Sequence, residues 1–193
     1  MKTIAEDILN YKPFNEEEDH DKLVILDFIS KNEDAFYREN PLAHMTASAW
    51  IVNYERTKVL MAYHNIYHSW SWLGGHADGN EDLLSVALKE AREESGVEHI
   101  HPVSNDIFSL EILSVDGHYK NEEYVSTHVH MNVTYLLEAD EQDPVFVKAD
   151  ENSAVGWFDL DAAVEASSEP WMREHIYRKL NEKVRRDYRK EEK

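Results

Sequence analysis

The chain has 193 residues, of which 42% are hydrophobic and 31% are charged, and its formal net charge is −19. This length and hydrophobic content suit one well-packed domain with an appendage, and the absence of cysteine excludes disulfides, zinc–thiolate clusters and a cysteine nucleophile. The acidic charge argues against DNA or long RNA as a partner, because such binding depends on basic groups that neutralise phosphates. A small phosphate-bearing nucleotide is compatible with it, since a divalent cation can bridge an acidic pocket to a diphosphate.

The first residues of the chain do not resemble a targeting segment. Met1 to Asp7 lack an apolar run followed by a small-residue cleavage site, and no apolar stretch approaches the length needed to span a bilayer. We therefore expect a soluble, cytoplasmic protein with no membrane partner.

Two helices are expected at the start of the chain. The first covers Ile4 to Tyr11, and the second begins at the N-cap Asn15, with Glu18 three positions later as in a capping box. Helices this short are marginal on their own, so we expect residues 1–43 to form a helical extension that packs on the main domain. A homodimer that covers their apolar face is the alternative.

The rest of the chain alternates between strand-like and helix-like segments. Strands are predicted at residues 46–54, 58–64, 69–73, 108–115, 124–137 and 154–158. Helices are predicted at residues 82–96, 161–166 and 169 to about 189. This order predicts an α/β protein with a mixed sheet covered by helices, in which residues 44–166 form the main domain and residues 167–193 a C-terminal helix.

The helix that ends at Gly96 carries the clearest chemical pattern. Glu90, Glu93 and Glu94 share one helical face, where three carboxylates repel one another unless a positive charge lies between them. Carboxylates are hard oxygen ligands, which suit Mg²⁺, with Mn²⁺ as the alternative. A solvated, charge-rich helical face would show the same local pattern, so the flanking residues decide between the two interpretations.

Those flanking residues resemble the Nudix box. From Gly75 to Val97 the chain has a glycine, five residues, Glu81, seven residues, and then a run that matches Arg-Glu-apolar-x-Glu-Glu-x-Gly-apolar. The single departure is Lys89, where the family has arginine. Lysine keeps the positive charge but lacks the planar fork that binds a carboxylate through two hydrogen bonds.

The resemblance implies a Nudix-like α/β/α sandwich around a mixed β-sheet, with the N-terminal extension and the C-terminal helix added to it. It also implies an enzyme, a Mg²⁺-dependent pyrophosphohydrolase that cleaves a phosphoanhydride bond in ADP-ribose, a nucleotide sugar or another nucleotide. The alternative is a non-catalytic, nucleotide-binding regulatory module of the same fold. The substrate is not identified, because Ile112 to Val115 lack the proline or tyrosine that marks some subgroups.

The resemblance also assigns roles within the motif. The metal ligands that it implies are Gly75 through its carbonyl, Glu90, Glu93 and Glu94. Glu93 and Glu94 are the catalytic glutamates, and Glu81 is expected to pair with Lys89 and hold the loop to the helix. A base must accept a proton from the attacking water, either a helix glutamate or a residue of the later loop, where Glu151 is the first candidate and Asp150 the second.

Four further residues are candidates for substrate binding. His128 and His130 lie on the polar side of an alternating strand, where they could contact phosphate or ribose, although structural histidines would show the same pattern. A zinc site built from both would need further ligands that the sequence does not identify. His76 lies in the loop of the motif, and Trp72 precedes its glycines, where it could stack on a base.

Overall fold

The computed structural model describes residues 3–120 and 122–188. Its helical segments are α1 (Ile4–Asn10), α2 (Glu16–Lys31), α3 (Leu83–Ser95), α4 (Leu160–Ala166), the π-helical segment η1 (Met172–Tyr177) and α5 (Arg178–Asp187). Its strands are β1 (Ala43–Asn53), β2 (Lys58–His64), β3 (Ser69–Ser71), β4 (Leu73–His76), β5 (His101–Pro102), β6 (Ser109–Val115), β7 (His118–Lys120), β8 (Glu123–Val125), β9 (His128–Ala139) and β10 (Asn152–Asp159). Part of the predicted C-terminal helix, from Arg189 onward, lies outside the described residues.

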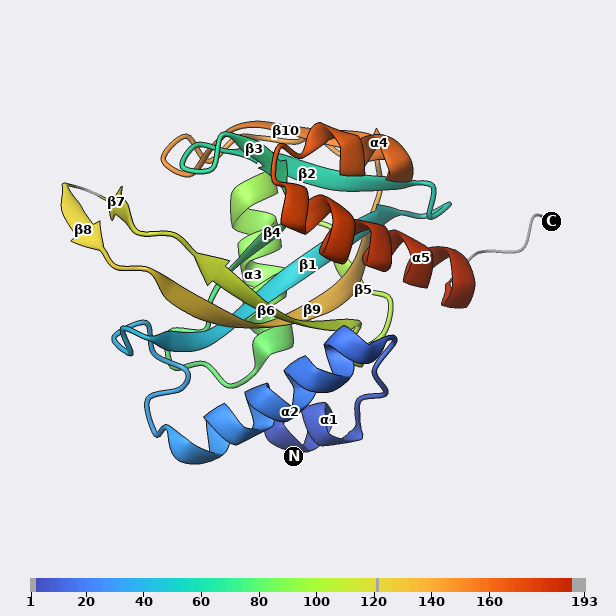
Figure 1. Ribbon diagram of the computed structural model, residues 1–193. Coiled ribbons are helices and arrows are strands. Elements are labelled where there is room, and N and C mark those ends of the chain that lie inside the picture. The colour runs from blue at the N-terminus through green and yellow to red at the C-terminus, as the bar shows by residue number, and fades with distance from the viewer. Residues whose placement is uncertain (1–2, 121, 189–193) are drawn as a thin grey trace.

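An eight-stranded mixed sheet forms the centre of the molecule (Figure 1). Its main order is β10-β2-β1-β9-β5, with β3 beside β2, β4 beside β1 and β6 beside β9. The long central pair β1–β9 is parallel, whereas the other pairs are antiparallel. The predicted mixed sheet is therefore present, and β7 and β8 form a separate two-stranded ribbon.

Two predicted strands are divided in the structure. The segment 69–73 becomes β3 and β4, because the chain pairs first with β2 and then, after Trp72, with β1. The segment 124–137 becomes β8, which pairs only with β7, and β9, which begins at His128. The division matters for the site, because β4 ends at His76 beside β1.

The strand β1 is buried along its whole length because helices cover both faces of the sheet. In Figure 1, α5 crosses in front of β1 and β2, whereas α3 lies behind the sheet. The side chains of β1 alternate between the two cores, as the two-residue period of a strand requires. Toward α3 lie Met45, Ala47, Ala49 and Ile51. Toward α4, η1 and α5 lie Trp50 and Val52.

The helix α3 has clear signals at both ends. Its N-cap Asp82 accepts a hydrogen bond from the Ser85 backbone N–H at 3.1 Å, which satisfies a donor that the first helical turn leaves free. It ends at Gly96, whose φ of 71° lies in the left-handed region and whose backbone packs so closely on the Phe146 side chain that a larger residue would not fit. The helix is thereby fixed in length, and its last two turns present the glutamates of the motif.

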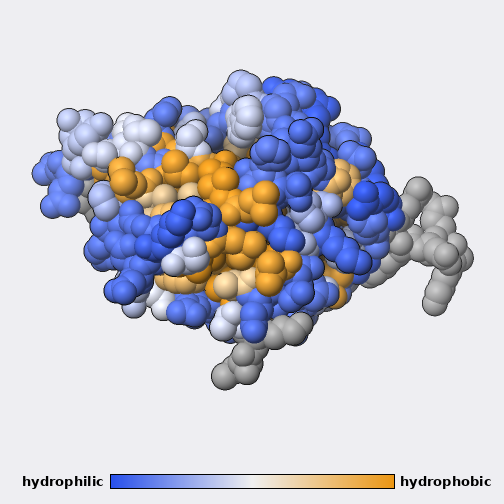
Figure 2. Space-filling model, turned by 60° about the horizontal axis from the view of Figure 1, so that its bottom comes forward, coloured by the Kyte–Doolittle hydropathy of each residue, from blue (hydrophilic) through white to orange (hydrophobic). Residues whose placement is uncertain are grey.

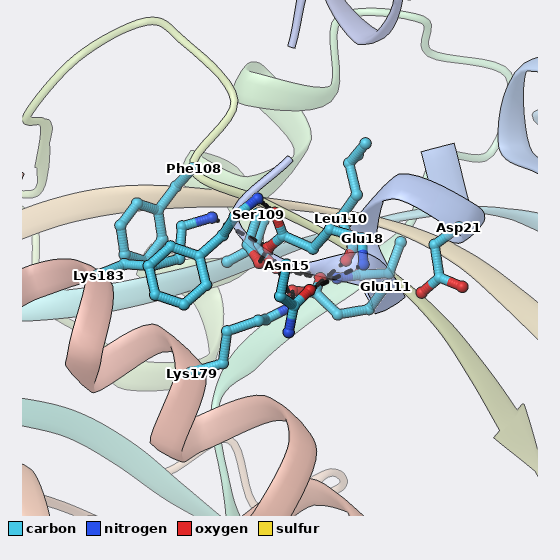
Figure 3. Close-up of polar contacts among 12 residues, drawn as sticks. Asn15, Glu18, Asp21, Phe108, Ser109, Leu110, Glu111, Lys179 and Lys183 are labelled. Atoms are coloured by element: carbon cyan, nitrogen blue, oxygen red, sulfur yellow. Dashed lines mark hydrogen bonds and ion pairs between the residues drawn. The ribbon is translucent and has the colours of Figure 1, made fainter. Parts of the chain in front are cut away.

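A buried ion cluster joins the two ends of the chain (Figure 3). Glu18 of α2 is fully buried, and its Oε1 lies 3.1 Å from Lys179 Nζ and 3.0 Å from Lys183 Nζ, both on α5. Ser109 of β6 donates a hydrogen bond of 2.6 Å to the same oxygen. Lys179 also lies 3.1 Å from Glu111, so α2, β6 and α5 meet at one polar centre.

This environment changes the ionisation of Glu18. Burial raises the pKa of its carboxyl, but the nearby ammonium groups of Lys179 and Lys183, together with hydrogen bonds from Ser109 and Tyr11, outweigh that effect and lower the pKa to about 2. The carboxylate of Glu18 also accepts the Phe14 backbone N–H at 2.8 Å, where a capping box would use that of Asn15. Glu18 therefore serves tertiary packing as well as the start of the helix.

The side of the molecule that carries α1 and α2 exposes hydrophobic residues (Figure 2). Leu9, Leu23 and Val24 are exposed by 62%, 62% and 48%. A homodimer through this face stays a prediction. None of the helices in the described part of the chain combines the length and apolar character that crossing a membrane requires.

Candidate functional site

The contact between Gly75 and Glu90 fixes one side of the acidic site. Gly75 lies on β4 opposite Ala47 of β1, and the Glu90 side chain packs directly over it. A Cβ atom at Gly75 would lie 2.7 Å from Glu90 Cδ, which is too close for an ordinary contact. A glycine at this position therefore lets the helix glutamate approach the strand backbone.

Glu94 is the most buried of the three helix glutamates, with 8% exposure. Its Oε2 accepts a hydrogen bond of 3.0 Å from the Gly74 backbone N–H. The pKa of Glu94 is raised to about 8, mainly because the carboxyl is buried. The negative charges of Glu151 and Glu90 raise this pKa further, whereas the hydrogen bond from Gly74 lowers it. An additional positive charge at this place would relieve the repulsion among these carboxylates.

Lys89 supplies part of this positive charge, through ion pairs with other glutamates than the predicted Glu81. Its Nζ lies 2.8 Å from Glu90 Oε1 and 3.2 Å from Glu93 Oε2. Within the described residues no ion pair joins Lys89 to Glu81, which is exposed and precedes the first turn of α3. Glu93 lies one helical turn after Lys89, so its carboxylate is within reach of the flexible lysine side chain.

The loop before β10 brings Glu151 to the same carboxylates. Lys148 Nζ lies 3.0 Å from Glu151 Oε2 and 3.6 Å from Glu93 Oε2, so one ammonium group connects the loop with α3. Asn152 Nδ2 donates a hydrogen bond of 2.9 Å to the Glu94 carbonyl and anchors the loop on the helix. Asp150, the second candidate base, is exposed. Lys148 is not among the residues predicted for the site, because nothing in the sequence around it indicates a contact with α3.

The donor atoms at this place fit a hard divalent cation. They are carboxylate oxygens of Glu90, Glu93, Glu94 and Glu151, next to the backbone of Gly75. Oxygen donors of this kind are preferred by Mg²⁺ and Mn²⁺. Burial is the main reason why the pKa of Glu94 is raised, and the negative charges of Glu151 and Glu90 add to the effect. The individual roles predicted for these glutamates stay predictions.

The three histidines expected to bind substrate lie in one cluster with a fourth, His44. The cluster consists of His44 at the start of β1, His76 at the end of β4, and His128 and His130 at the start of β9. A ligand nitrogen from each residue lies within 4.8 Å of those from the others. Burial and the neighbouring histidines His76, His44 and His128 lower the pKa of His130 to about 2. His44 is not among the predicted residues, because its contact depends on the parallel register that places it opposite His130.

The polar side of β9 changes character beyond the histidines. Asn132 and Thr134 are buried, and both donate hydrogen bonds to Glu111 Oε2, of 3.0 and 2.7 Å. The Thr46 and Ser48 hydroxyls of β1 each donate a bond of 2.9 Å to Asn132 Oδ1. These polar side chains form hydrogen bonds with one another inside the molecule. The histidine cluster continues this row of polar side chains toward the start of β9.

Trp72, the candidate for base stacking, packs on the C-terminal helical segment. Its ring meets the Tyr177 ring edge-on with centroids 5.8 Å apart, and its backbone N–H donates a hydrogen bond of 3.3 Å to Tyr177 Oη. The indole is half-buried among residues of the second core. Its observed contacts are therefore packing contacts, and stacking on a base stays a prediction.

Comparisons with known proteins agree with this fold. A family model described as the NUDIX domain matches residues 42–180. The chain is 29% identical over 108 residues to the asymmetrical bis(5'-nucleosyl)-tetraphosphatase of Rattus norvegicus, a match that covers 55% of this chain and 66% of that protein, slightly less than two thirds.

Two solved structures have a similar fold. An Ap4A hydrolase of C. elegans, in a binary complex, has a TM-score of 0.54 and 18% identity, with 73% of this chain and 97% of that chain covered. The dihydroneopterin triphosphate pyrophosphohydrolase of E. coli has a TM-score of 0.50 and 15% identity, with 69% and 91% covered. The predicted α/β fold with a mixed sheet between helical layers is confirmed.

Proposed function

The chain belongs to the NUDIX family, and from this premise we propose that it is a Mg²⁺-dependent pyrophosphohydrolase. The bond cleaved is a phosphoanhydride in a nucleoside diphosphate that is linked to another group. The observation that carries the proposal is that Glu90 and Glu94 of α3 contact the backbone of β4, while Lys148 links Glu93 of the same helix to Glu151 in the loop before β10. Carboxylate oxygens of this kind are the protein ligands that Mg²⁺ prefers.

The residues that would hold the metal are Gly75, Glu90, Glu93 and Glu94. When bound there, Mg²⁺ polarises a phosphoryl oxygen and lowers the pKa of a coordinated water. The short approach of Glu90 to Gly75 and the hydrogen bond from Gly74 to Glu94 support this assignment, because they hold two of the carboxylates in place. A fixed donor set loses little conformational entropy when it binds an ion.

For Glu151 we propose the role of the base that accepts the proton of the attacking water. Its ion pair with Lys148, which also approaches Glu93, keeps the carboxylate beside α3. The backbone also holds the loop, since the Asn65 N–H donates a hydrogen bond of 3.0 Å to the Glu151 carbonyl. A base must lie within reach of the attacking water, and the contacts that keep Glu151 beside the glutamates of α3 support this proposal.

As substrate class we propose dinucleoside polyphosphates. The support is the rat relative, whose name describes a bis(5'-nucleosyl)-tetraphosphatase, together with the strong acidity of the chain, which favours small substrates carried with a cation over long nucleic acids. ADP-ribose, nucleotide sugars and nucleoside triphosphates are the competing classes, and a direct comparison of rates separates them.

The test is hydrolysis by the purified chain with Mg²⁺ across a panel of these four classes, with products separated by chromatography. We expect turnover that Glu93→Gln and Glu94→Gln abolish and that Glu98→Gln, which changes an exposed glutamate after the helix, leaves intact. Nucleotide binding that needs no metal and gives no product with any class would instead support the regulatory module.

A further inference from the structure

We propose that His44, His76, His128 and His130 form a binding site for Zn²⁺ that is separate from the carboxylates of α3. The four residues come from three strands, β1, β4 and β9, which meet at one end of the sheet. The proposal concerns a metal of a different chemical class from the one used in phosphoanhydride hydrolysis, and it does not depend on the hydrolase assignment.

The spacing of the nitrogens is close to that of a tetrahedral site. Zinc binds histidine nitrogen at about 2.0–2.1 Å, so two ligands of a regular tetrahedron lie about 3.3 Å apart. His128 Nε2 and His130 Nε2 are already 3.1 Å apart, and a ligand nitrogen from each of the four residues lies within 4.8 Å of the others. A tetrahedral site therefore requires that the remaining nitrogens, which lie within 4.8 Å of one another, approach to about 3.3 Å.

Hydrogen bonds on the far side of two rings prepare the nitrogens that point inward. His44 Nδ1 lies 3.2 Å from the Asn40 carbonyl, and His128 Nδ1 lies 2.8 Å from the Ser126 carbonyl. A carbonyl oxygen only accepts, so each Nδ1 is the protonated nitrogen and each Nε2 carries a lone pair. Backbone carbonyls orient metal-binding histidines in the same way in known sites.

His44 gives an independent indication of a missing ligand. It is 4% exposed, and its Nε2 has no hydrogen-bond partner among the residues that the structure describes. A buried polar atom without a partner costs free energy, and such atoms are rare in native proteins. A cation at the centre of the cluster would satisfy this nitrogen.

The donor type selects the ion. All four donors are imidazole nitrogens, which suit zinc and similar transition ions, whereas Mg²⁺ prefers oxygen and retains water. A site closed by four protein ligands is typical of a structural metal. Because His76 directly follows Gly75 on β4, zinc here would fix the end of the strand against which Glu90 packs.

Direct metal binding tests the proposal. The full chain, produced without a polyhistidine tag and stripped with a chelator, is titrated with Zn²⁺, and bound metal is counted by native mass spectrometry. We expect one zinc per chain that excess Mg²⁺ does not displace and that Glu93→Gln retains. His44→Gln and His128→Gln should each weaken zinc binding by about 100-fold, whereas His101→Gln, an exposed histidine outside the cluster, should not.

A second measurement covers the case in which a histidine variant fails to fold, which circular dichroism would reveal. Wild-type chain loaded with Co²⁺ should show the intense visible absorption of a tetrahedral site, and Zn²⁺ should remove it. Equal zinc binding by His44→Gln and His101→Gln would overturn the proposal. So would weak absorption typical of six-coordinate cobalt, or loss of the metal in excess Mg²⁺. If these histidines bind phosphate instead, pyrophosphate should bind to the chelator-treated chain and no zinc should be retained in the titration, which would also overturn the proposal.

Discussion

Glu18 and Lys183 lie 165 positions apart in the chain, yet their side chains form a buried ion pair of 3.0 Å. Both groups are almost completely removed from water, and each would be costly to leave alone. The pair joins the second helix of the N-terminal extension to the last helix, on either side of β6.

The first prediction concerns this pair and pH. The folded-state pKa of Glu18 is about 2, below its ordinary value of 4.5, so its contribution to stability is complete above pH 4.5 and is lost as the pH falls toward 2. We expect acid to remove on the order of 3 kcal/mol of the free energy of unfolding through this group.

The measurement is urea unfolding between pH 2.5 and pH 7. Glu18→Gln should lower stability at neutral pH by about 3 kcal/mol or more, because it leaves the buried ammonium of Lys183 without a carboxylate and that of Lys179 with Glu111 alone, and it should flatten the acid dependence. Glu16→Gln, an exposed neighbour on the same helix, is the control. An unchanged pH dependence in Glu18→Gln would contradict the assignment.

The second prediction concerns Gly75→Ala. The new methyl group would meet the Glu90 carboxyl end at 2.7 Å, and this flexible side chain would move aside. We expect kcat/KM to fall by about tenfold or more, since misplacement of a catalytic group by about 1 Å has effects of this size, while the melting temperature changes little. Gly156→Ala is the matched control, because its nearest contacts at 3.8 Å leave room for a methyl group. Loss of folding without a selective loss of activity would speak against the contact.

The third prediction concerns Lys148→Met. Removing this ammonium group takes a positive charge from Glu93 and Glu151, so Mg²⁺ should bind about fivefold more tightly, which corresponds to about 1 kcal/mol for a partly exposed pair. Turnover should fall, because the ion pair no longer holds Glu151 beside α3. Lys58→Met, which breaks an ion pair with Glu141, should change neither quantity. Weaker Mg²⁺ binding in Lys148→Met would show that the proposed electrostatic competition is wrong.

The fourth prediction concerns the second core. Trp50 is fully buried and stacks on Tyr177 with ring centroids 5.3 Å apart, so Trp50→Ala should lower the free energy of unfolding by about 3–5 kcal/mol. Trp171→Ala, at a tryptophan that is 59% exposed, should cost about 1 kcal/mol or less. Chemical unfolding of both variants checks the contrast, and similar losses would mean that burial does not determine the effect.

The part of the site that is predictable from the sequence is the part that a single helix carries. Glu90, Glu93 and Glu94 share a face because the helical period alone brings them together, and that period is readable from the spacing. The likeness to a known motif then indicated the fold, because strands before and after the motif fit it.

Contacts between residues far apart in the sequence could not be predicted from local spacing. His44 lies opposite His130 only through the parallel pairing of β1 with β9, and nothing local in either segment indicates that pairing or its register. The local pattern likewise suggested a capping box for Glu18, whereas tertiary contacts with α5 determine its environment. The pairing of Glu81 with Lys89 stays a prediction that the motif implies, and the ion pairs that Lys89 forms in the structure are with Glu90 and Glu93.

The ion cluster of Glu18 also has a consequence for folding during synthesis, because the packing of α2 depends on lysines of α5. A ribosome releases the N-terminal helices first, long before Lys179 and Lys183 exist to neutralise the carboxylate that those helices bury. Until α5 emerges, the surface between α2 and β6 either stays open to water or keeps Glu18 protonated, since an unpaired charge is not stable there. The packing of α2 against β6 and α5 is therefore completed only after α5 has been made.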